Sequence, residues 1–469
     1  MEVTKQYQVD VDAVKETFRF TTTGLQHKQA VNYKMLPFVA NETKLVSEFA
    51  GVTGAFSRMV AQKELKEDFD VNLFLENAAD QVDDYDEENN KEAQNRNAFK
   101  SIVRTLFLDE DKLVHFDVKT LNYVAANSSE EKVALFLFSS MIDEKSLEAA
   151  RQTYEKPVDN MLYKIVLEAL PKLRDKTYRV GEYVCYLPYV KELFQKDFQL
   201  LLSNEDFYKQ SLSHFLEFYY MFYLSQLIMK LNRFENADLT AQEPLYFTLD
   251  WEKTAKTRMA YQYGWEKLKP LTETFFTHAV VLEMLNHDGS GIPKGYLELK
   301  QILDAQETFQ NTVDELLKLY TEQIGKMDSK DYKNSLHGKV DFEAITDGFS
   351  RVKDLYETVR YQFENSTRSR ANDSFRNWFI KFYQANFAKR RGQLGYNLNI
   401  TEDDIIFLTK LCVGTEDKIK LKDLFVEMEK RGVYFDKYSQ EKIEILYEKL
   451  NLLEKKSDSG DAKYVKSIL

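Results

Sequence analysis

The chain is short of glycine and proline, the two residues that most often interrupt regular structure. Its 469 residues include 16 Gly and 7 Pro, about 5% in all, where roughly 12% is usual. Turn-rich folds need many more of both, so the shortage excludes a collagen, a Gly/Pro-rich disordered chain and most β-sandwiches. Aromatic residues make up 14% of the chain, enough to fill large cores. We therefore expect a mainly α fold, built as a multi-helix bundle.

Apolar residues recur at helical spacing from about residue 95 onward. The longest apolar stretch, 215–231, contains Glu217, Ser225 and Gln226, so we interpret it as a helix buried in a bundle rather than a membrane span. Pro270 suits the first turn of a helix. No repeat of fixed period is present, which argues against a solenoid. Helices are expected over 130–154, 158–170, 204–234, 250–269, 270–287, 296–325, 341–364 and 369–390.

The last seventy residues have a different pattern of shorter elements. A capping box that starts at Thr401 begins a first helix, and Gly414 ends it. A second helix ends at Gly432, and Ser439 is expected to cap a third. Residues 452–469 then predict a strand, a tight turn and a second strand. Three short helices followed by a hairpin are the element order of a winged helix.

Composition shifts divide the chain into four expected segments. The stretch DGSGIPKG, residues 288–295, is the clearest internal linker. The segments are an N-terminal region 1–95 with an acidic loop at 64–92, a helical domain 96–290, a second helical segment 291–395 with a basic aromatic helix, and a winged-helix-like module 396–469.

The net charge of the chain conceals two opposite regions. It is −12, with a pI near 5.3, which by itself argues against nucleic-acid binding. Residues 64–92 hold twelve acids against two Lys, a local charge of −10, so the rest of the chain carries only −2. The end of this stretch, 81–95, lacks periodicity and predicts a solvated loop. A basic surface elsewhere in the chain is therefore compatible with the average charge.

Residues 366–391 form the most basic stretch, with seven cations and a single acid, Asp373. Helical spacing places a stripe of aromatic side chains on one face and Arg370 and Lys381 on the opposite face. One face would pack while the other offers donors to a phosphate backbone. An acidic protein partner, the chain's own acidic loop or a plain solvated surface would explain the same pattern. The candidate DNA-binding residues here are Arg368, Arg370, Arg376, Lys381, Lys389, Arg390 and Arg391.

The expected C-terminal hairpin is also basic. Wings of winged helices touch the DNA backbone. The helix before the hairpin, 439–450, has at least as many acids as bases, whereas base-reading helices usually offer Arg, Asn or Gln. We therefore interpret the module as a docking surface, with backbone contact as the alternative. The hairpin adds four candidate DNA-binding residues, Lys455, Lys456, Lys463 and Lys466.

Motifs for catalysis are missing from the sequence. The glycines of 288–295 match neither G-x-G-x-x-G nor G-K-[ST], and no H-E-x-x-H occurs. His214 with Glu217, and Glu283 with His287, have the spacing of metal ligands on one helix face. The simpler interpretation is a satisfied polar pair in one case and a helix-end histidine in the other. We expect no catalytic residue, no metal site and no cofactor.

The cysteines and the first residues bear on the compartment. Cys185 and Cys412 share no short motif, so neither a zinc ribbon nor a disulfide framework is expected. The first sixteen residues are charged and predict no signal peptide. Together these features favour a reduced, cytoplasmic protein without a membrane partner.

Two stretches resemble a known family. They are PLYFTLDWEKTAKTRMAYQYGWEKL, residues 244–268, and the C-terminal run that begins with LGYNLNITEDDIIFLTKLCVG, residues 394–414. Both resemble the DNA phosphorothioation-dependent restriction protein DptG, also called DndG. The resemblance covers at least residues 204–469 and is most distinctive in the C-terminal run.

The resemblance implies a subunit of a bacterial restriction system that attacks DNA lacking a sulfur-for-oxygen replacement in its backbone and spares modified host DNA. It implies two partner subunits that resemble ATPases or helicases, and it brings no assigned catalytic residue. The expected function is a non-catalytic subunit that bridges these partners, contacts the backbone of double-stranded DNA and serves in defence against foreign DNA. A metal-dependent nuclease subunit of the same system and a winged-helix transcription regulator remain as alternatives.

Overall fold

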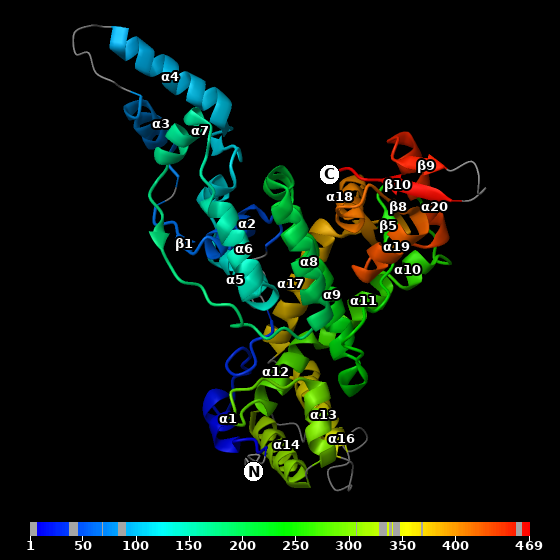
Figure 1. The fold of residues 1–469 in the computed structure, drawn as a ribbon. Helices are drawn as coiled ribbons and strands as arrows, with labels where there is room; N and C mark the ends of the chain where they lie inside the picture. The colour runs from blue at the N-terminus through cyan, green and yellow to red at the C-terminus, as the bar shows by residue number, and fades with distance from the viewer. Residues whose placement is uncertain are drawn as a thin grey trace, which may run out of the picture.

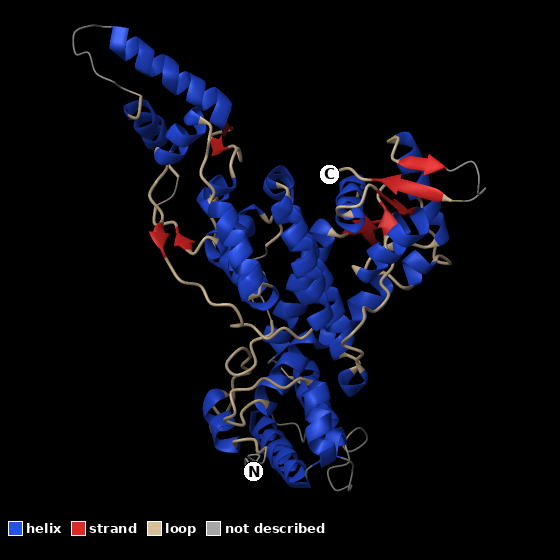
Figure 2. Cartoon of the chain, in the orientation of Figure 1, coloured by secondary structure: helices blue, strands red, loops and turns tan. Residues whose placement is uncertain are grey.

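The computed structural model describes ten stretches of the chain, and helices dominate them (Figure 2). The expectation of a mainly α fold is therefore confirmed. Within these stretches, no helix combines the length and the apolar character needed to cross a bilayer. The described residues are 7–36, 46–67, 69–82, 91–305, 307–327, 335–336, 340, 348–366, 369–455 and 462–469.

A long central helix, α9 (Glu205–Leu231), organises the molecule (Figure 1). It confirms the helix expected over 204–234, and nearly every side chain from Phe215 to Leu231 is buried. α8 (Pro188–Ser203), α2 (Ala50–Val60) and α11 (Trp265–Leu271) pack along it. A helix that is apolar on all sides must be covered on all sides, which is why α9 lies at the centre.

The single helix expected over 130–154 is wrong. The chain forms α5 (Ser128–Met141) and α6 (Glu144–Glu155) with a break between them. The Asp143 side chain accepts a hydrogen bond from the Ser146 backbone N–H at 2.7 Å and begins a new helix. α5 packs closely on α2, and α1 (Val11–Thr17) lies in a different lobe beside α14 (Glu307–Met327) (Figure 1).

A separate unit projects at one end of the molecule, and we call it the arm, residues 69–82, 91–113 and 161–170 (Figure 1). It contains α3 (Val71–Asp80), α4 (Lys91–Phe107), the paired strands β2 (Leu108–Asp109) and β3 (Lys112–Leu113), and α7 (Met161–Glu168). Helix α7 confirms the expectation for 158–170. Its apolar cluster is distinct from the main core.

The acidic stretch 64–92 is not one loop. Residues 71–80 form α3, where the Asp70 side chain caps the helix, and α4 begins at Lys91. The expectation of a loop is wrong for these residues, and 83–90 lie outside the described part of the chain. A two-residue pairing of β1 (Lys63–Glu64) with β4 (Arg174–Asp175) lies where the arm meets the body.

A second lobe is built from α12 (Phe275–Leu285), α13 (Tyr296–Ala305), α14 and α16 (Gly348–Asn365) (Figure 1). The helix expected over 250–269 is wrong in its first half. Only α10 (Met259–Gln262) and α11 are helical there, and Pro270 lies inside α11 rather than in the first turn of the next helix. Arginine side chains, instead of helical N–H groups, donate to the backbone carbonyls of Leu249, Asp250, Glu252 and Lys253.

The basic helix is shorter than expected. Helix α17 (Arg370–Asn386) ends before β6 (Ala388–Arg390), so a helix through residue 390 is wrong. β6 pairs antiparallel with β7 (Tyr396–Ile400), and β5 (Thr248–Leu249) pairs parallel with β7 on its other side. The antiparallel pairing of β6 with β7, its neighbour in the chain, replaces the helical hydrogen bonds of these residues.

The C-terminal module, residues 396–469, contains three further helices and a second small sheet. The expected capping box on Thr401 and Asp404 is confirmed, whereas the cap of the third helix is Asp436 rather than Ser439. The expected pairing of two final strands is confirmed, while its turn lies within 456–461, outside the described residues. The elements are α18 (Glu402–Val413), β8 (Lys418–Lys420), α19 (Leu421–Lys430), α20 (Lys437–Lys449), β9 (Leu453–Lys455) and β10 (Lys463–Lys466), with antiparallel sheet order β8-β10-β9.

One continuous apolar core extends through the remainder of the molecule. It includes Val14, Val133, Leu316 and Leu411, one from each of the four expected segments. The four-segment division of the chain stays a prediction.

Candidate nucleic-acid and partner interfaces

The aromatic stripe of α17 packs as expected. Phe375, Trp378, Phe379 and Phe382 are all buried. Trp378 meets the Tyr220 ring of α9 edge-to-face at 5.8 Å, and this contact fixes α17 against the central helix. The opposite face of α17 is therefore the only one on which its cations can reach an external ligand.

The cations of α17 differ in whether they already form contacts within the chain. Arg370 and Lys381 are exposed, although Lys381 has a partner within the chain. Arg376 forms an ion pair with Asp373 at 3.1 Å, one helical turn away. Arg368 lies outside the described residues. Of these cations, Arg370 is the best placed to contact a phosphate.

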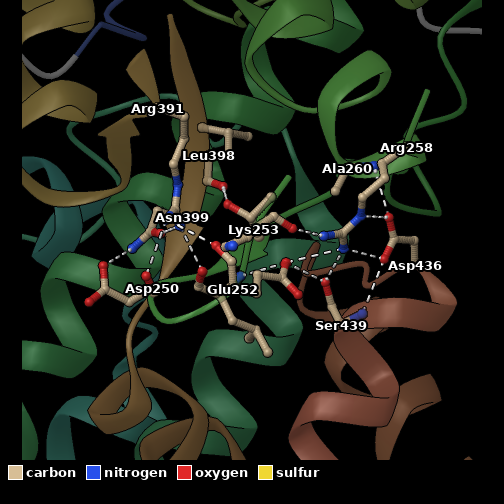
Figure 3. A network of polar contacts seen from close by, with 12 residues as sticks. Asp250, Glu252, Lys253, Arg258, Ala260, Arg391, Leu398, Asn399, Asp436 and Ser439 are labelled. Atoms are coloured by element: carbon tan, nitrogen blue, oxygen red, sulfur yellow. Dashed lines mark hydrogen bonds and ion pairs between the residues drawn. The ribbon is translucent and has the colours of Figure 1, made fainter. Parts of the chain in front are cut away.

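The three cations that follow α17 lie on β6 and just after it. Lys389 forms an ion pair with Asp250, and Arg390 is exposed. Arg391 donates to the carbonyl oxygens of Leu249 at 2.7 Å and Glu252 at 3.1 Å. Its guanidinium therefore ties β6 to the segment after β5, as Figure 3 shows. We infer from this geometry that Arg391 has a structural role. Lys389 is exposed but paired, which leaves Arg390 as the exposed cation without an ion pair within the described residues.

The hairpin cations also meet acids of their own module. Lys455 pairs with Glu448 at 2.7 Å, and Lys463 pairs with Glu444. Lys466 donates to the Asn451 carbonyl at 3.1 Å, and Lys456 lies outside the described residues. These pairs are at the surface, where water screens them, so an external phosphate can compete for the lysines at small cost.

Helix α20 has an exposed face that does not include its two paired glutamates. Tyr438, Lys442, Ile445 and Lys449 are exposed, and helical spacing places them along one stripe. Glu444 and Glu448, on the neighbouring face, are held by the hairpin lysines. We call Tyr438, Lys442, Ile445 and Lys449 the α20 stripe. Its mixture of apolar and cationic side chains suits an acidic amphipathic partner as well as a phosphate backbone.

A buried polar joint attaches α20 to the segment before α10 (Figure 3). Arg258 donates through Nε to Asp436 Oδ2 at 2.9 Å and through Nη2 to Glu252 Oε1 at 3.1 Å. Ser439 Oγ donates to the same Glu252 oxygen at 2.8 Å. Burial raises the pKa of Asp436, but the charge and hydrogen bond of Arg258, together with backbone N–H groups of Ser439 and Ala260, lower the pKa below its usual value. The joint therefore holds α20 in one orientation.

A second buried joint connects the end of α19 to α8. Arg431 donates to both carboxylate oxygens of Asp197, at 2.8 and 2.7 Å, and Tyr219 donates to Asp197 Oδ2 at 2.6 Å. Both charged side chains are 1% exposed. Burial raises the pKa of the neighbouring Cys412 thiol to about 12, so this cysteine is a structural thiol in the resting protein.

In the first candidate metal pair, His214 with Glu217, the histidine takes part in a contact between two helices. His214 Nε2 lies 2.6 Å from Asp404 Oδ1, and the imidazole stacks on Phe407 at 4.2 Å. Burial raises the pKa of the adjacent Glu217 to about 7, opposed by His214 and reinforced by Asp404. This cluster fastens α9 to α18, consistent with the simpler interpretation of a polar pair.

The second pair is used by the N-terminal segment. The buried Glu283 carboxylate accepts backbone N–H groups of Val31, Asn32 and Tyr33 at 3.0, 2.8 and 3.1 Å. Burial raises the pKa of Glu283, but the hydrogen bonds from His287 and these amides lower it overall. His214 and Glu283 serve different contacts, and no group of three His, Cys, Asp or Glu in the described stretches is arranged to hold a metal ion.

Sequence reasoning missed the residues of the two buried joints. Asp436 carries a local signal, because an Asp before a helix is a typical N-cap. Arg258 and Arg431 carry none, since their partners lie 178 and 234 residues away in the chain. No protein-family model and no curated protein matches the sequence, so the assignment of function depends on these residues and contacts.

Proposed function

We propose that the chain is a non-catalytic bridging subunit of a DNA restriction complex of the kind that the resemblance to DptG implies. The observation that carries the proposal is the arrangement of lobes around α9. The arm, the lobe of α12–α16 and the C-terminal module diverge from the central helix and leave separate surfaces exposed (Figure 1). Such a body suits simultaneous contact with two partner subunits and DNA.

Two surfaces are the candidate partner contacts. On the arm, Ile102 and Leu106 are 50% and 56% exposed and lie one turn apart on α4. On the C-terminal module, the α20 stripe exposes Tyr438 and Ile445, which alternate with Lys442 and Lys449. Exposed apolar side chains at helical spacing are typical of helix-in-groove contacts. We assign each surface to a different partner.

The C-terminal module supports the proposal through its element order. A helix, a strand, two helices and a two-stranded hairpin follow one another, and the first strand joins the hairpin in one sheet. We propose that this is a winged-helix-like module. Its internal pairing of Glu444 and Glu448 with hairpin lysines favours docking on a protein over reading of base edges.

Co-purification with the two ATPase-like subunits tests the bridge. We expect the wild-type chain to join both in one complex, Ile102→Glu with Leu106→Glu to lose one partner, and Tyr438→Ala with Ile445→Glu to lose the other. Lys145→Glu, at an exposed position of α6, is the matched control and should retain both. A chain that captures neither subunit contradicts the proposal.

The DNA contact is tested separately. If Arg370 and Arg390 each contact a phosphate, retention of duplex DNA should weaken about tenfold between 50 and 200 mM salt. Reversal of both charges to Glu should abolish that salt dependence, while Lys112→Glu with Lys145→Glu should leave it unchanged. Retention that does not respond to salt or to the Arg370 and Arg390 substitutions removes DNA contact from the proposal and leaves the protein bridge.

A further inference from the structure

Within the described stretches, one buried cation, Arg58, forms no ion pair with a carboxylate. Four Lys or Arg side chains in the described stretches are buried, namely Arg58, Lys230, Arg351 and Arg431. Lys230 pairs with Glu243 at 3.7 Å, Arg351 with Asp314 at 2.7 Å and Arg431 with Asp197 at 2.7 Å. Arg58, at 6% exposure, has no Asp or Glu within ion-pair distance among the described residues. A buried charge without a counter-ion is costly, so this exception calls for a physical reason.

Arg58 is held by neutral groups. Its Nη1 donates to the Asn122 carbonyl at 3.0 Å and to the Val124 carbonyl at 2.7 Å. The approach of α2 to this backbone is close, because a Cβ on Gly54 would lie 2.2 Å from the Val124 oxygen. The guanidinium is therefore fixed in place by the fold. Burial lowers the pKa of Arg58, and Tyr178 and Glu131 only partly oppose this.

Arg58 borders a pocket of about 480 Å³ between α2, α5 and residues 176–182. Volumes of about 300 to 1,000 Å³ are typical of small-molecule sites. The half-buried Tyr178 ring forms part of the wall and packs edge-to-face on Phe138 at 6.4 Å. We call this space the Arg58 pocket.

The charge of the Arg58 pocket is positive. Lys132, Lys176 and Arg179 also line it, together with the acids Glu131 and Glu182. Lys176 is neutralised by Glu64 at 2.6 Å, and Glu182 is neutralised by Lys34, both from outside the lining. The remaining charged groups are Arg58, Lys132 and Arg179 against Glu131, a balance of +2. A phosphate monoester carries about −1.5 to −2 at neutral pH, which matches this balance.

We propose that the Arg58 pocket binds a phosphate monoester joined to an aromatic group, with a nucleoside monophosphate as the ligand class. Arg58 would donate to the phosphate from the floor, Lys132 and Arg179 would approach it from the exposed rim, and the Tyr178 ring would face the base. The anion would take the place of the carboxylate that Arg58 does not have among the described residues. Arginine suits phosphate because its guanidinium carries several hydrogen-bond donors. The proposal does not depend on membership of a restriction complex.

The source of the phosphate is either a free nucleotide or the 5′ end of a DNA strand, since both present the same monoester. Titration calorimetry on the full chain should compare deoxyadenosine monophosphate with unphosphorylated deoxyadenosine, and a 5′-phosphorylated oligonucleotide with its 5′-hydroxyl form. We expect binding only in the phosphorylated member of at least one pair. Equal binding, or no binding, of both members of both pairs overturns the proposal.

Variants separate the site from adventitious binding. Lys132→Gln with Arg179→Gln changes two exposed side chains and should weaken binding at least about tenfold without altering the melting temperature. Arg58→Gln should abolish binding. If that variant fails to fold, the rim variant alone decides. Arg174→Gln, an exposed arginine on β4 outside the pocket, is the control and should bind as wild type. Unchanged affinity in the rim variant contradicts the assignment.

Discussion

The C-terminal module and the arm are attached to the molecule in opposite ways. The module is held by buried charged contacts, with Arg431 on Asp197 and Arg258 on Asp436. The arm has its own small apolar cluster, and exposed ion pairs such as Lys176 with Glu64 lie at its base. Buried ion pairs cost desolvation and accept only one geometry, whereas exposed pairs contribute little. The module is thus held in a fixed orientation, while the arm is able to open locally.

Removal of Asp197 should produce the largest effect. Asp197→Ala leaves Arg431 buried without a counter-charge and Tyr219 without its acceptor, which we expect to lower the free energy of unfolding by about 3–5 kcal/mol. Denaturant unfolding measures the loss. Glu427→Ala removes only the more exposed partner of Arg431, 3.2 Å from Nη1, and should cost less than about 1 kcal/mol.

The double variant Asp197→Leu with Arg431→Met sharpens this test. It removes both charges at once and should recover much of the stability lost in Asp197→Ala, because apolar pairs of similar volume often replace buried ion pairs without loss. A cost below about 1 kcal/mol for Asp197→Ala alone would mean that the joint does not fix the module.

A substitution that creates a cavity in the arm should destabilise the arm alone. Val103 is fully buried in the arm's cluster, and Val103→Ala should destabilise that cluster by about 2 kcal/mol through lost burial and the residual cavity. We expect amide hydrogen exchange to accelerate in α3, α4 and α7 while the main unfolding transition is unchanged. Ile102→Ala, at the neighbouring exposed position, is the control and should alter neither. A matching shift of the main transition would show that the arm unfolds only with the body.

The sequence and the structure agree where local signals suffice. The all-round apolar stretch 215–231 predicts a buried helix, and the Thr401 capping box places the start of α18. The break at Asp143 was missed because the apolar spacing continues across it, although an N-cap competes with helix continuation there. The strands β5, β7 and β8 are short and pair with segments distant in the chain, so their register is set by tertiary contacts.

For the candidate site, too, local sequence signals predict only part of what the structure has. Composition indicates the basic segment 366–391, and helical spacing places its aromatic stripe on the packed face. Neither shows which of its cations form contacts within the chain. Arg391 binds carbonyls of a segment about 140 residues earlier, and Arg258 binds an acid 178 residues later. The Arg58 pocket could not be predicted for the same reason, because nothing in the sequence around Arg58 indicates that this arginine is buried without a carboxylate partner among the described residues.

The cluster that joins α9 to α18 should give the smallest effect, and it depends on pH. Glu217 has a folded pKa of about 7, raised by burial from 4.5. Between these values the folded state keeps a proton that the unfolded state has lost, so the contribution of Glu217 to stability falls as pH rises from 4.5 to 7. Asp404 has the opposite sign, because its lowered pKa adds stability that is lost only as pH falls below its ordinary range.

Glu217→Gln removes the first of these dependences and leaves the second. We expect the variant to be more stable than wild type at pH 8 by about 1 kcal/mol, a fraction of the full linkage of about 1.4 kcal/mol per pH unit because the side chain is partly exposed. At pH 4 the two proteins should be alike. Glu441→Gln, at an exposed position of α20, should follow wild type throughout. An equal difference at both pH values would assign the effect to packing rather than to the ionisation of Glu217.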